Sequence, residues 1–428
     1  MFEVTILLGT FLFLVAIGLP IAFGLGISAL ITAASVGFGP VMLIQRVAAG
    51  MQSFPLITIP LFILAGAIMT KGGVAKRIVN FAYVLVGRFP GGLAMVNVVQ
   101  AMFFGGVSGS SVADISSIGP IVIPMMEEKG YDRDFATALT VSASTQGIII
   151  PPSHNIVIYA MVVGGVSIGQ LFLAGYIPGL VMAVCLAITC YIVAVKRSYP
   201  CEKPPRFKDS IVIIRDGLLS TFAAVIVVGG IAFGIFTATE ASAIAVIYAL
   251  FLALVVYREM KISDLWPLLI RSVKTTSIIM LLIGTASAFG WMVTYLQIPK
   301  MITTAFLSVS HNPIVLLLMI NGLLLFLGCI MDVAPLILIM SPILLPLVQA
   351  AGMSPVTFGI LLMVNLAVGL TTPPVGAGLF VGCSIANTTM EKCTKAMLIF
   401  WPAMIITLLL TTYVPWVTTF LPSLFPVQ

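Results

Sequence analysis

The sequence predicts an all-α, polytopic membrane protein built from two inverted-topology repeats. Of its 428 residues 60% are hydrophobic and only 8% are charged, whereas a soluble domain carries about 25% charged residues. The apolar runs are long and lack the alternation of a membrane β-strand, so they predict spanning helices. Glycine and proline also recur at one constant spacing in the two halves. Together these observations exclude a soluble enzyme and favour a duplicated helical bundle.

Ten apolar segments are long enough to be interpreted as full membrane spans. The first lacks a basic start and a small-residue cleavage site, so we expect a retained span rather than a signal peptide. Two others exceed the roughly 20 residues that one crossing needs, and a Pro-Pro pair interrupts each of them. The ten segments are 2–18, 20–37, 55–71, 134–165, 169–195, 217–236, 240–257, 275–297, 355–388 and 397–421.

Two further apolar segments are folded by a break near their centre. Segment 91–127 is broken by Ser and Gly, and segment 313–350 by Asp and Pro. Because the break folds each segment back on itself, both predict re-entrant helical hairpins. An amphipathic piece precedes each hairpin, at 74–89 and 299–312, and we expect these pieces to be arm helices at the membrane interface.

The distribution of Lys and Arg orients the chain. The segment 196–216 carries six of them, which predicts a cytoplasmic linker because basic loops stay inside. Counting spans from this linker puts both termini on the periplasmic side and 18 of the 20 Lys and Arg in the cytoplasm, with only Arg46 and Lys300 outside. The net charge of +6 therefore indicates loops rather than a nucleic-acid partner. The first hairpin then enters from the cytoplasm and the second from the periplasm, which is an inverted repeat.

This topology predicts five regions. Residues 1–90 are first-half scaffold spans and an arm, and 91–195 are the first hairpin and broken helix. Residues 196–216 are the linker. Residues 217–312 repeat the scaffold and arm, and 313–428 repeat the hairpin and broken helix. We expect the two hairpin regions to move together against a static frame.

The repeated glycines and prolines are the strongest pointer to a binding site. Matched positions differ by 222 residues throughout, as in Gly106/Gly328, Pro120/Pro342, Ile121/Ile343, Pro124/Pro346, Gly130/Gly352, Gly147/Gly369, Pro151/Pro373 and Pro152/Pro374. Proline removes a backbone donor and frees a carbonyl one turn back. Freed carbonyls and hydroxyls suit a sodium ion, and half-helix N-termini suit an anion. Paired interrupted segments of this kind mark the binding site of a transporter.

The candidate residues fall into two groups at the hairpin tips and the breaks. The predicted sodium ligands are Ser108, Gly109, Ser110, Ser111, Gly147, Gly328, Asp332, Gly369, Thr371 and Thr372. The predicted substrate-binding residues are Gln146, Pro151, Pro152, Ser153, His154, Asn155, Pro373 and Pro374. No cofactor is expected, and Na⁺ is the expected coupling ion.

Each candidate has a structural alternative. Ser and Thr also mediate helix packing, and Asp332 could cap its hairpin, although an ionisable residue inside an apolar segment indicates function. Asp114 is a weaker candidate just past the first tip. His154 could be a core histidine bonded to backbone. Glu240 follows Thr237 as in a helix start, so a structural cap is favoured over a proton relay. The six cysteines are interpreted as small core residues.

The motifs resemble the large membrane subunit of TRAP transporters, the tripartite ATP-independent periplasmic family (DctM-like). The resemblance covers nearly the whole chain and rests on GGVSGSSVAD (105–114), GPIVIPMMEEKGYDRDFA (119–136), GIIIPPS (147–153), LFLAGYIPG (171–179) and GIFTATEASA (234–243). It implies a multi-pass protein of the bacterial inner membrane that imports organic acids with sodium by an elevator mechanism. It also implies two partners, a small four-helix membrane subunit and a periplasmic substrate-binding protein.

Two residues depart from the family's pattern and bear on the substrate. The family carries apolar residues after Pro-Pro-Ser, whereas this chain has His154 and Asn155. Their second-half counterparts, Gly376 and Ala377, are small. Added neutral hydrogen-bonding groups favour a polyhydroxylated acid such as a sialic acid over a C4-dicarboxylate.

Two other functions are compatible with parts of the sequence. The run 106–109 matches the GxSG of rhomboid intramembrane proteases, in which Ser108 and His154 would form a catalytic dyad, but duplication of the whole architecture argues against an enzyme. A stand-alone sodium–dicarboxylate symporter would have the same inverted halves and need no binding protein. ATP-driven transport is disfavoured because the sequence has no GxxxxGK[ST] motif.

Overall fold

The computed structural model describes residues 2–201 and 207–425, and these residues form helices and no strand. The first half contains α1 Phe2–Ala16, α2 Ile21–Val36, α3 Pro40–Met51, the 3₁₀-helix η1 Phe54–Ile57, α4 Thr58–Lys71, α5 Val74–Val86, α6 Gly92–Ser108, α7 Ser111–Glu128, α8 Arg133–Ser144, α9 Gln146–Ile149, α10 His154–Val163 and α11 Ile168–Arg197. The second half contains α12 Phe207–Ala232, α13 Ala238–Phe251, the π-helix η2 Leu252–Val256, the 3₁₀-helix η3 Ile262–Asp264, α14 Leu265–Tyr295, α15 Ile298–Val309, α16 Pro313–Gly328, α17 Val333–Ala350, α18 Pro355–Gly369, α19 Ala377–Ala386, α20 Met390–Met397, α21 Trp401–Tyr413 and α22 Trp416–Leu424.

The repeat seen in the sequence is also a repeat of helices. Helix α17 begins and ends 222 residues after α7, and α20 begins 222 residues after α11. Both hairpins form as paired helices, α6 with α7 and α16 with α17, and the chain is interrupted between α9 and α10 and between α18 and α19. The Pro151–Pro152 and Pro373–Pro374 bonds in these interruptions are both cis. The predicted hairpins and broken helices are therefore present.

The number of spans differs from the ten predicted. In the described residues six helices are long and apolar enough to cross a membrane, or eight if each bent pair counts as one span. Helices α1 and α2 have only 15 and 16 residues. The predicted span 397–421 is wrong as a single helix, because it contains the bend between α20 and α21 and the break before α22. Pro402 lies in the first turn of α21, and Pro415 follows the end of that helix. A proline cannot continue a helix from the preceding turn.

Three other boundaries differ from the prediction. Helix α14 begins at Leu265, ten residues before the predicted span 275–297. Helix α3 was not predicted; it starts at Pro40, a residue favoured in a first helical turn. The predicted linker 196–216 overlaps the ends of α11 and α12, and its residues 202–206 lie outside the described part of the chain.

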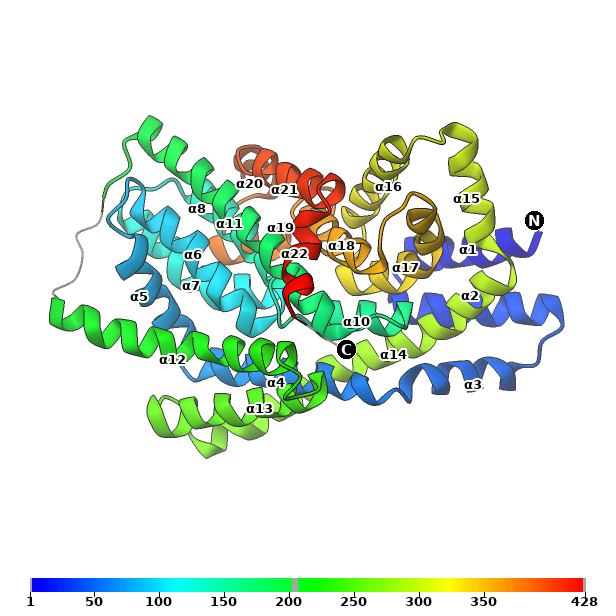
Figure 1. Cartoon of the computed structure of the whole chain (residues 1–428), viewed down its shortest axis with the longest axis horizontal. Helices are drawn as coiled ribbons and strands as arrows, with labels where there is room; N and C mark the ends of the chain where they lie inside the picture. Colours follow the sequence, from blue (N-terminus) through cyan, green and yellow to red (C-terminus); the bar gives the residue numbers. More distant parts are fainter. Residues whose placement is uncertain (1, 202–206, 426–428) are drawn as a thin grey trace.

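The helices lie in two groups (Figure 1). Helices α3, α4, α12, α13 and α14 run along one side, where α4 packs on α13 and α14, and α14 packs on α2 and α3. The hairpins and broken helices lie on the other side, and α10, α6 and α17 reach across to α4 and α14. Elements from the two halves of the sequence are thus interleaved in both groups.

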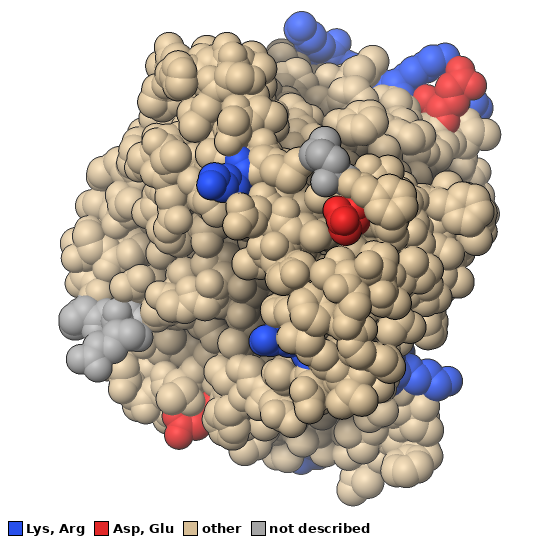
Figure 2. Space-filling model, turned by 90° about the vertical axis from the view of Figure 1, so that its right-hand side faces the viewer, with Lys and Arg blue, Asp and Glu red and all other residues tan. Residues whose placement is uncertain are grey.

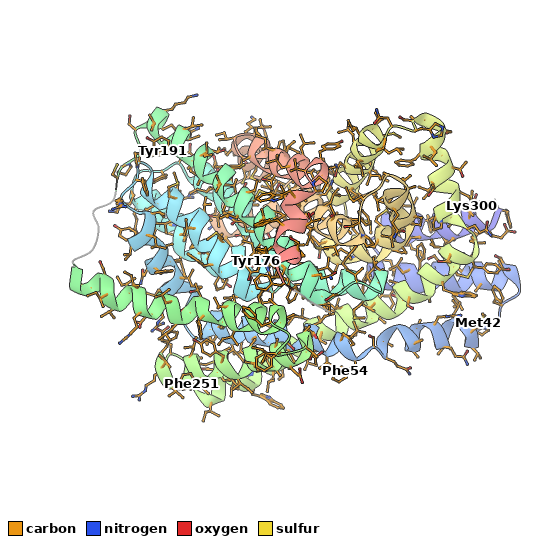
Figure 3. All side chains as sticks on the ribbon, in the orientation of Figure 1. Met42, Phe54, Tyr176, Tyr191, Phe251 and Lys300 are labelled. Carbon is orange, nitrogen blue, oxygen red and sulfur yellow. The ribbon has the colours of Figure 1, made fainter. Side chains whose placement is uncertain are left out.

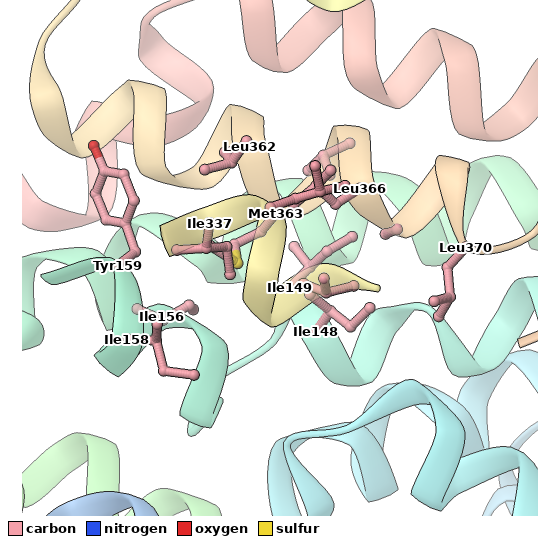
Figure 4. Close-up of a cluster of buried hydrophobic side chains, with 14 of the residues drawn as sticks. Ile148, Ile149, Ile156, Ile158, Tyr159, Ile337, Leu362, Met363, Leu366 and Leu370 are labelled. Carbon is pink, nitrogen blue, oxygen red and sulfur yellow. The ribbon is translucent and has the colours of Figure 1, made fainter. Parts of the chain in front are cut away.

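The two broken regions share one apolar core (Figure 4). Ile148 and Ile149 of α9 lie beside Ile337 of α17 and Leu366 of α18, and all four are buried. Tyr159 of α10 reaches the start of α18, where its hydroxyl donates to the carbonyl of Pro355 at 2.6 Å. This core joins the interruption of one half to that of the other.

The outer surface is that of a membrane protein. Figure 2 shows a face on which charged side chains are few and widely spaced. Phe54 and Phe251 lie on the edge formed by the long helices (Figure 3) and are 68% and 51% exposed. In contrast, Tyr176 lies inside, where its hydroxyl donates to the Pro151 carbonyl at 3.3 Å. Apolar side chains therefore face outward, as lipid contact requires.

Candidate functional site

A cavity of about 640 Å³ lies between the two groups of helices. Both hairpin tips, the first break and two helices of the long-helix side contribute to its wall. Its polar lining residues are Thr70, Lys71, Ser108, Ser110, Ser111, Ser116, Ser117, His154, Asn155, Arg271, Ser272, Thr275 and Asp332. Six predicted site residues thus share one cavity: Ser108, Ser110, Ser111, His154, Asn155 and Asp332.

The first hairpin tip is a tight turn between α6 and α7. Gly109 ends α6 with a φ of +66°, which favours glycine. Ser110 is the N-cap of α7, and its hydroxyl accepts from the Ala113 N–H at 3.4 Å. The hydroxyl of Ser108 hydrogen-bonds Oδ1 of Asp114, whose side chain is buried. The other carboxylate oxygen, Oδ2, has no hydrogen-bond partner among the described residues.

The second hairpin tip is capped at the matching position. Asp332 lies 222 residues after Ser110 and is the N-cap of α17, accepting from the Val333 N–H at 2.8 Å. It is exposed and lines the cavity. Asp332 therefore caps the hairpin, as the structural alternative proposed, while it also presents a carboxylate to the cavity.

Glycines bring each tip against its broken helix. A Cβ placed at Gly105 would lie 2.8 Å from both Cα and N of Gly147. A Cβ at Gly369 would lie 2.7 Å from Cα of Gly328. Real Cβ atoms are not found this close to backbone. Close backbone contact therefore requires glycine at positions 105 and 369, whereas a Cβ at the repeated Gly147 would meet Oδ2 of the buried Asp114 at 2.5 Å.

The first break presents only part of its polar residues to the cavity. Gln146 is buried and turns toward α6, where its Nε2 donates to the Val98 carbonyl at 3.4 Å. Ser153 donates to the Gly109 carbonyl at 3.5 Å. His154 and Asn155, the first residues of α10, line the cavity.

The second break is attached to the second tip through its backbone. The Cys329 carbonyl accepts from the N–H groups of Val375 and Gly376 at 3.1 and 3.4 Å. The hydroxyls of Thr371 and Thr372 donate to the Val368 carbonyl at 2.7 and 2.9 Å, which leaves their oxygen lone pairs as acceptors. The residues after Pro373 and Pro374 thus hold the tip rather than face the cavity.

Sequence reasoning missed part of the cavity wall. On α4 the missed residues include Thr70 and Lys71, and on α14 they include Arg271, Ser272 and Thr275. The charge pattern of the sequence places Lys71 and Arg271 among the cytoplasmic loop cations. The sequence does contain a signal for them: Arg271 and Thr275 are four residues apart. Side chains at this spacing lie on one face of a helix.

Glu240 lies outside this cavity and forms the predicted helix start. Its carboxylate accepts from the Thr237 N–H at 2.8 Å, and the Thr237 hydroxyl accepts from the Glu240 N–H at 3.3 Å. This reciprocal pair is a capping box at the start of α13, which confirms the structural interpretation of Glu240.

The chain is similar to several bacterial proteins along nearly its whole length. It is 42% identical to the uncharacterized protein YgiK of Salmonella typhimurium, over 99% of this chain and 98% of that one. It is 38% identical to the isethionate TRAP transporter permease protein DctMQ of Oleidesulfovibrio alaskensis, over 97% of this chain and 66% of that one. It is also 38% identical to the sialic acid TRAP transporter large permease protein SiaM of Vibrio cholerae, over 95% and 96% of the two chains.

The fold itself has a solved relative. The YdaH transporter of Alcanivorax borkumensis, whose crystal structure was described as an unusual topology, superposes with a TM-score of 0.61 over 89% of this chain and 88% of that one. At 13% identity this likeness shows the fold alone. It agrees with an all-helical protein that contains bent and re-entrant helix pairs.

A family model covers almost the entire sequence. Residues 8–417 match the model described as tripartite ATP-independent periplasmic transporter, DctM component. Membership of a transporter family decides against the intramembrane protease in which Ser108 and His154 would be catalytic. The chain is a multi-pass membrane protein and belongs to the DctM family, the large permease component of tripartite ATP-independent periplasmic transporters.

Proposed function

We propose that this chain imports an organic acid together with sodium across the bacterial inner membrane, as the large permease of a three-part transporter. Two relatives named for isethionate and sialic acid transport are equally similar to it, so identity alone does not select the substrate. The DctMQ relative extends beyond the region that this chain matches, which supports a small membrane subunit as one partner. A periplasmic binding protein is the other.

The lining of the cavity carries the substrate proposal. Eight hydroxyl-bearing side chains face it, together with the imidazole of His154 and the amide of Asn155. Two of these hydroxyls, those of Ser111 and Ser272, are buried without a hydrogen-bond partner among the described residues, which is costly unless a ligand supplies the bond. A polyhydroxylated acid such as a sialic acid satisfies more of these groups than a C4-dicarboxylate does.

Sodium is proposed to bind where the tips meet the broken helices. The first tip offers the Ser110 hydroxyl and the backbone beside Gly147, and the second offers Asp332 and the backbone beside Gly369. These groups are oxygens, the ligands that hard cations take. Binding of sodium would join each tip to its break before the substrate arrives.

The movement is proposed to be that of an elevator with inverted halves. Regions 91–195 and 313–428 would carry the substrate past a frame made of 1–90 and 217–312. The interleaved packing of α4 with α13 and α14 supports a frame shared by both halves. Both termini would then lie in the periplasm.

Uptake into proteoliposomes tests the proposal. The chain is reconstituted with its small membrane subunit and binding protein, and labelled N-acetylneuraminate and succinate are supplied with an inward sodium or potassium gradient. We expect sodium-dependent uptake of N-acetylneuraminate. Uptake of succinate alone would refute the substrate, and equal uptake with potassium would refute sodium coupling. Uptake by the chain without partners would instead favour a stand-alone symporter.

A further inference from the structure

The cavity is chemically different at its two walls. The wall made by the hairpin tips carries an acceptor with a negative charge, the carboxylate of Asp332. The Ser108 hydroxyl donates to Asp114, which leaves its oxygen as a further acceptor. The wall made by α4 and α14 carries the cations Lys71 and Arg271. Acceptors suit a cation such as sodium, whereas a carboxylate needs donors.

The donors on the second wall are free to meet a ligand. Lys71 is the last residue of α4, and Arg271 lies two turns into α14; both are exposed. Neither forms a salt bridge within the described ranges 2–201 and 207–425. An arginine fork matches a carboxylate in two parallel hydrogen bonds, and a lysine adds a point charge.

A buried serine beside Arg271 gives an independent indication. Ser272 is 5% exposed and lines the same cavity, and its hydroxyl has no hydrogen-bond partner among the residues that the structure describes. By contrast, Thr70 and Thr275 donate to the carbonyls of Gly66 and Arg271 at 2.8 and 3.2 Å. An unpaired buried hydroxyl is costly, so Ser272 is suited to a ligand that reaches it.

We propose that Arg271, Lys71 and Ser272 form an anion site on the frame, which holds the carboxylate of the substrate only when the hairpin tips stand beside α4 and α14. This rests on the proposed function, because the site is assigned to the frame of an elevator. Basic residues mark the cytoplasmic side, so the arrangement belongs to the inward-facing state. Once sodium leaves, the carboxylate of Asp332 repels the substrate and Arg271 attracts it toward the exit.

Kinetics of uptake separate this site from a general binding role. Arg271→Gln, Lys71→Gln and the double variant are compared with Lys274→Gln, which removes a cation from the same helix outside the cavity lining. The probes are labelled N-acetylneuraminate and labelled succinate, carried by the complete complex. We expect the double variant to lower the maximal rate at least five-fold and to leave the KM for loaded binding protein within two-fold. Arg271→Lys keeps the charge without the fork, so it should lose less of the rate than Arg271→Gln does. Lys274→Gln should match the wild type.

Three results would overturn the anion site. These are a wild-type maximal rate in the double variant, an equal loss in Lys274→Gln, and a rise in KM without a fall in rate. If Arg271→Gln does not fold, the uptake rate of Lys71→Gln alone tests the anion site.

An inactive wild-type complex would refute the proposed function. The anion site would then be tested by whether N-acetylneuraminate or succinate raises the unfolding temperature of the purified chain. We expect stabilisation of the wild type that is lost in the double variant, and its absence in the wild type would overturn the site.

Discussion

Replacing Gly369 by alanine should force the second hairpin tip away from its broken helix. The new Cβ would lie 2.7 Å from Cα, 2.8 Å from C and 3.1 Å from O of Gly328. Carbon atoms in favourable contact are about 3.5 Å apart or more, so the two backbones must separate by about 0.8 Å. All three atoms belong to the backbone of Gly328, so no flexible side chain can move aside to relieve the contact.

The expected loss of stability in Gly369→Ala can be taken from overpacked protein cores. An extra methyl group in a tight contact costs about 1–3 kcal/mol, and the better helix propensity of alanine offsets at most about 1 kcal/mol of it. A net loss of about 1–2 kcal/mol corresponds to a factor of roughly 5–30 in an equilibrium. If the contact of Gly369 with Gly328 forms part of the sodium site, the sodium concentration for half-maximal uptake should rise by a similar factor.

The control lies in the hairpin that Gly369 contacts. Gly322 lies in α16, and a Cβ there would have no atom within 4 Å, so Gly322→Ala should leave thermal unfolding and sodium dependence unchanged or slightly improved. Gly105→Ala should behave like Gly369→Ala, because its Cβ would lie 2.8 Å from Gly147. The reasoning is refuted if Gly369→Ala unfolds at the same temperature, and titrates with the same sodium midpoint, as Gly322→Ala.

Three further variants test other parts of the site. Asp332→Asn keeps a capping oxygen and removes the charge, so we expect a sodium midpoint raised about ten-fold, since a change of 1.4 kcal/mol is ten-fold; an unchanged titration would remove Asp332 from the sodium site. Ser108→Ala leaves the buried Asp114 carboxylate without its donor and should lower the free energy of unfolding by about 1–3 kcal/mol. Adding Asp114→Asn should restore part of this stability, and a double variant as unstable as Ser108→Ala would contradict the pairing. Thr237→Ala removes half of a capping box and should cost about 0.5–2 kcal/mol without altering the sodium midpoint, and an altered midpoint would revive a transport role for Glu240.

The features that the sequence predicted well are those that a few local residues determine. Both hairpins and both breaks follow from Gly and Pro, whose backbone effects need no knowledge of neighbours. The tip at Gly109 and the interruption at Pro151 are examples. The capping box at Glu240 was predictable for the same reason, since its two partners are three residues apart.

The features that were missed depend on what a segment packs against. Arg271 resembled a loop cation because charge usually marks the end of a span, yet α14 begins earlier and turns this residue into the cavity. Gln146 was predicted to face the substrate, but its amide bonds the backbone of α6. Neither orientation is encoded by the residue type or by its immediate neighbours.

The two halves use the same cap position for different chemistry. Ser110 and Asp332 both start the second helix of a hairpin, but only Asp332 adds a negative charge to the cavity. The first half has its carboxylate four residues later, at Asp114, where it is 1% exposed and held by Ser108; the position matching it in the second half is Leu336. A cation held by Asp114 would therefore be separated from the cavity by packed side chains, whereas a cation held by Asp332 would face it. We accordingly expect exchange of the substrate to depend on the second tip far more than on the first, and variants of Asp332 to change both sodium and substrate dependence where variants of Asp114 change mainly stability.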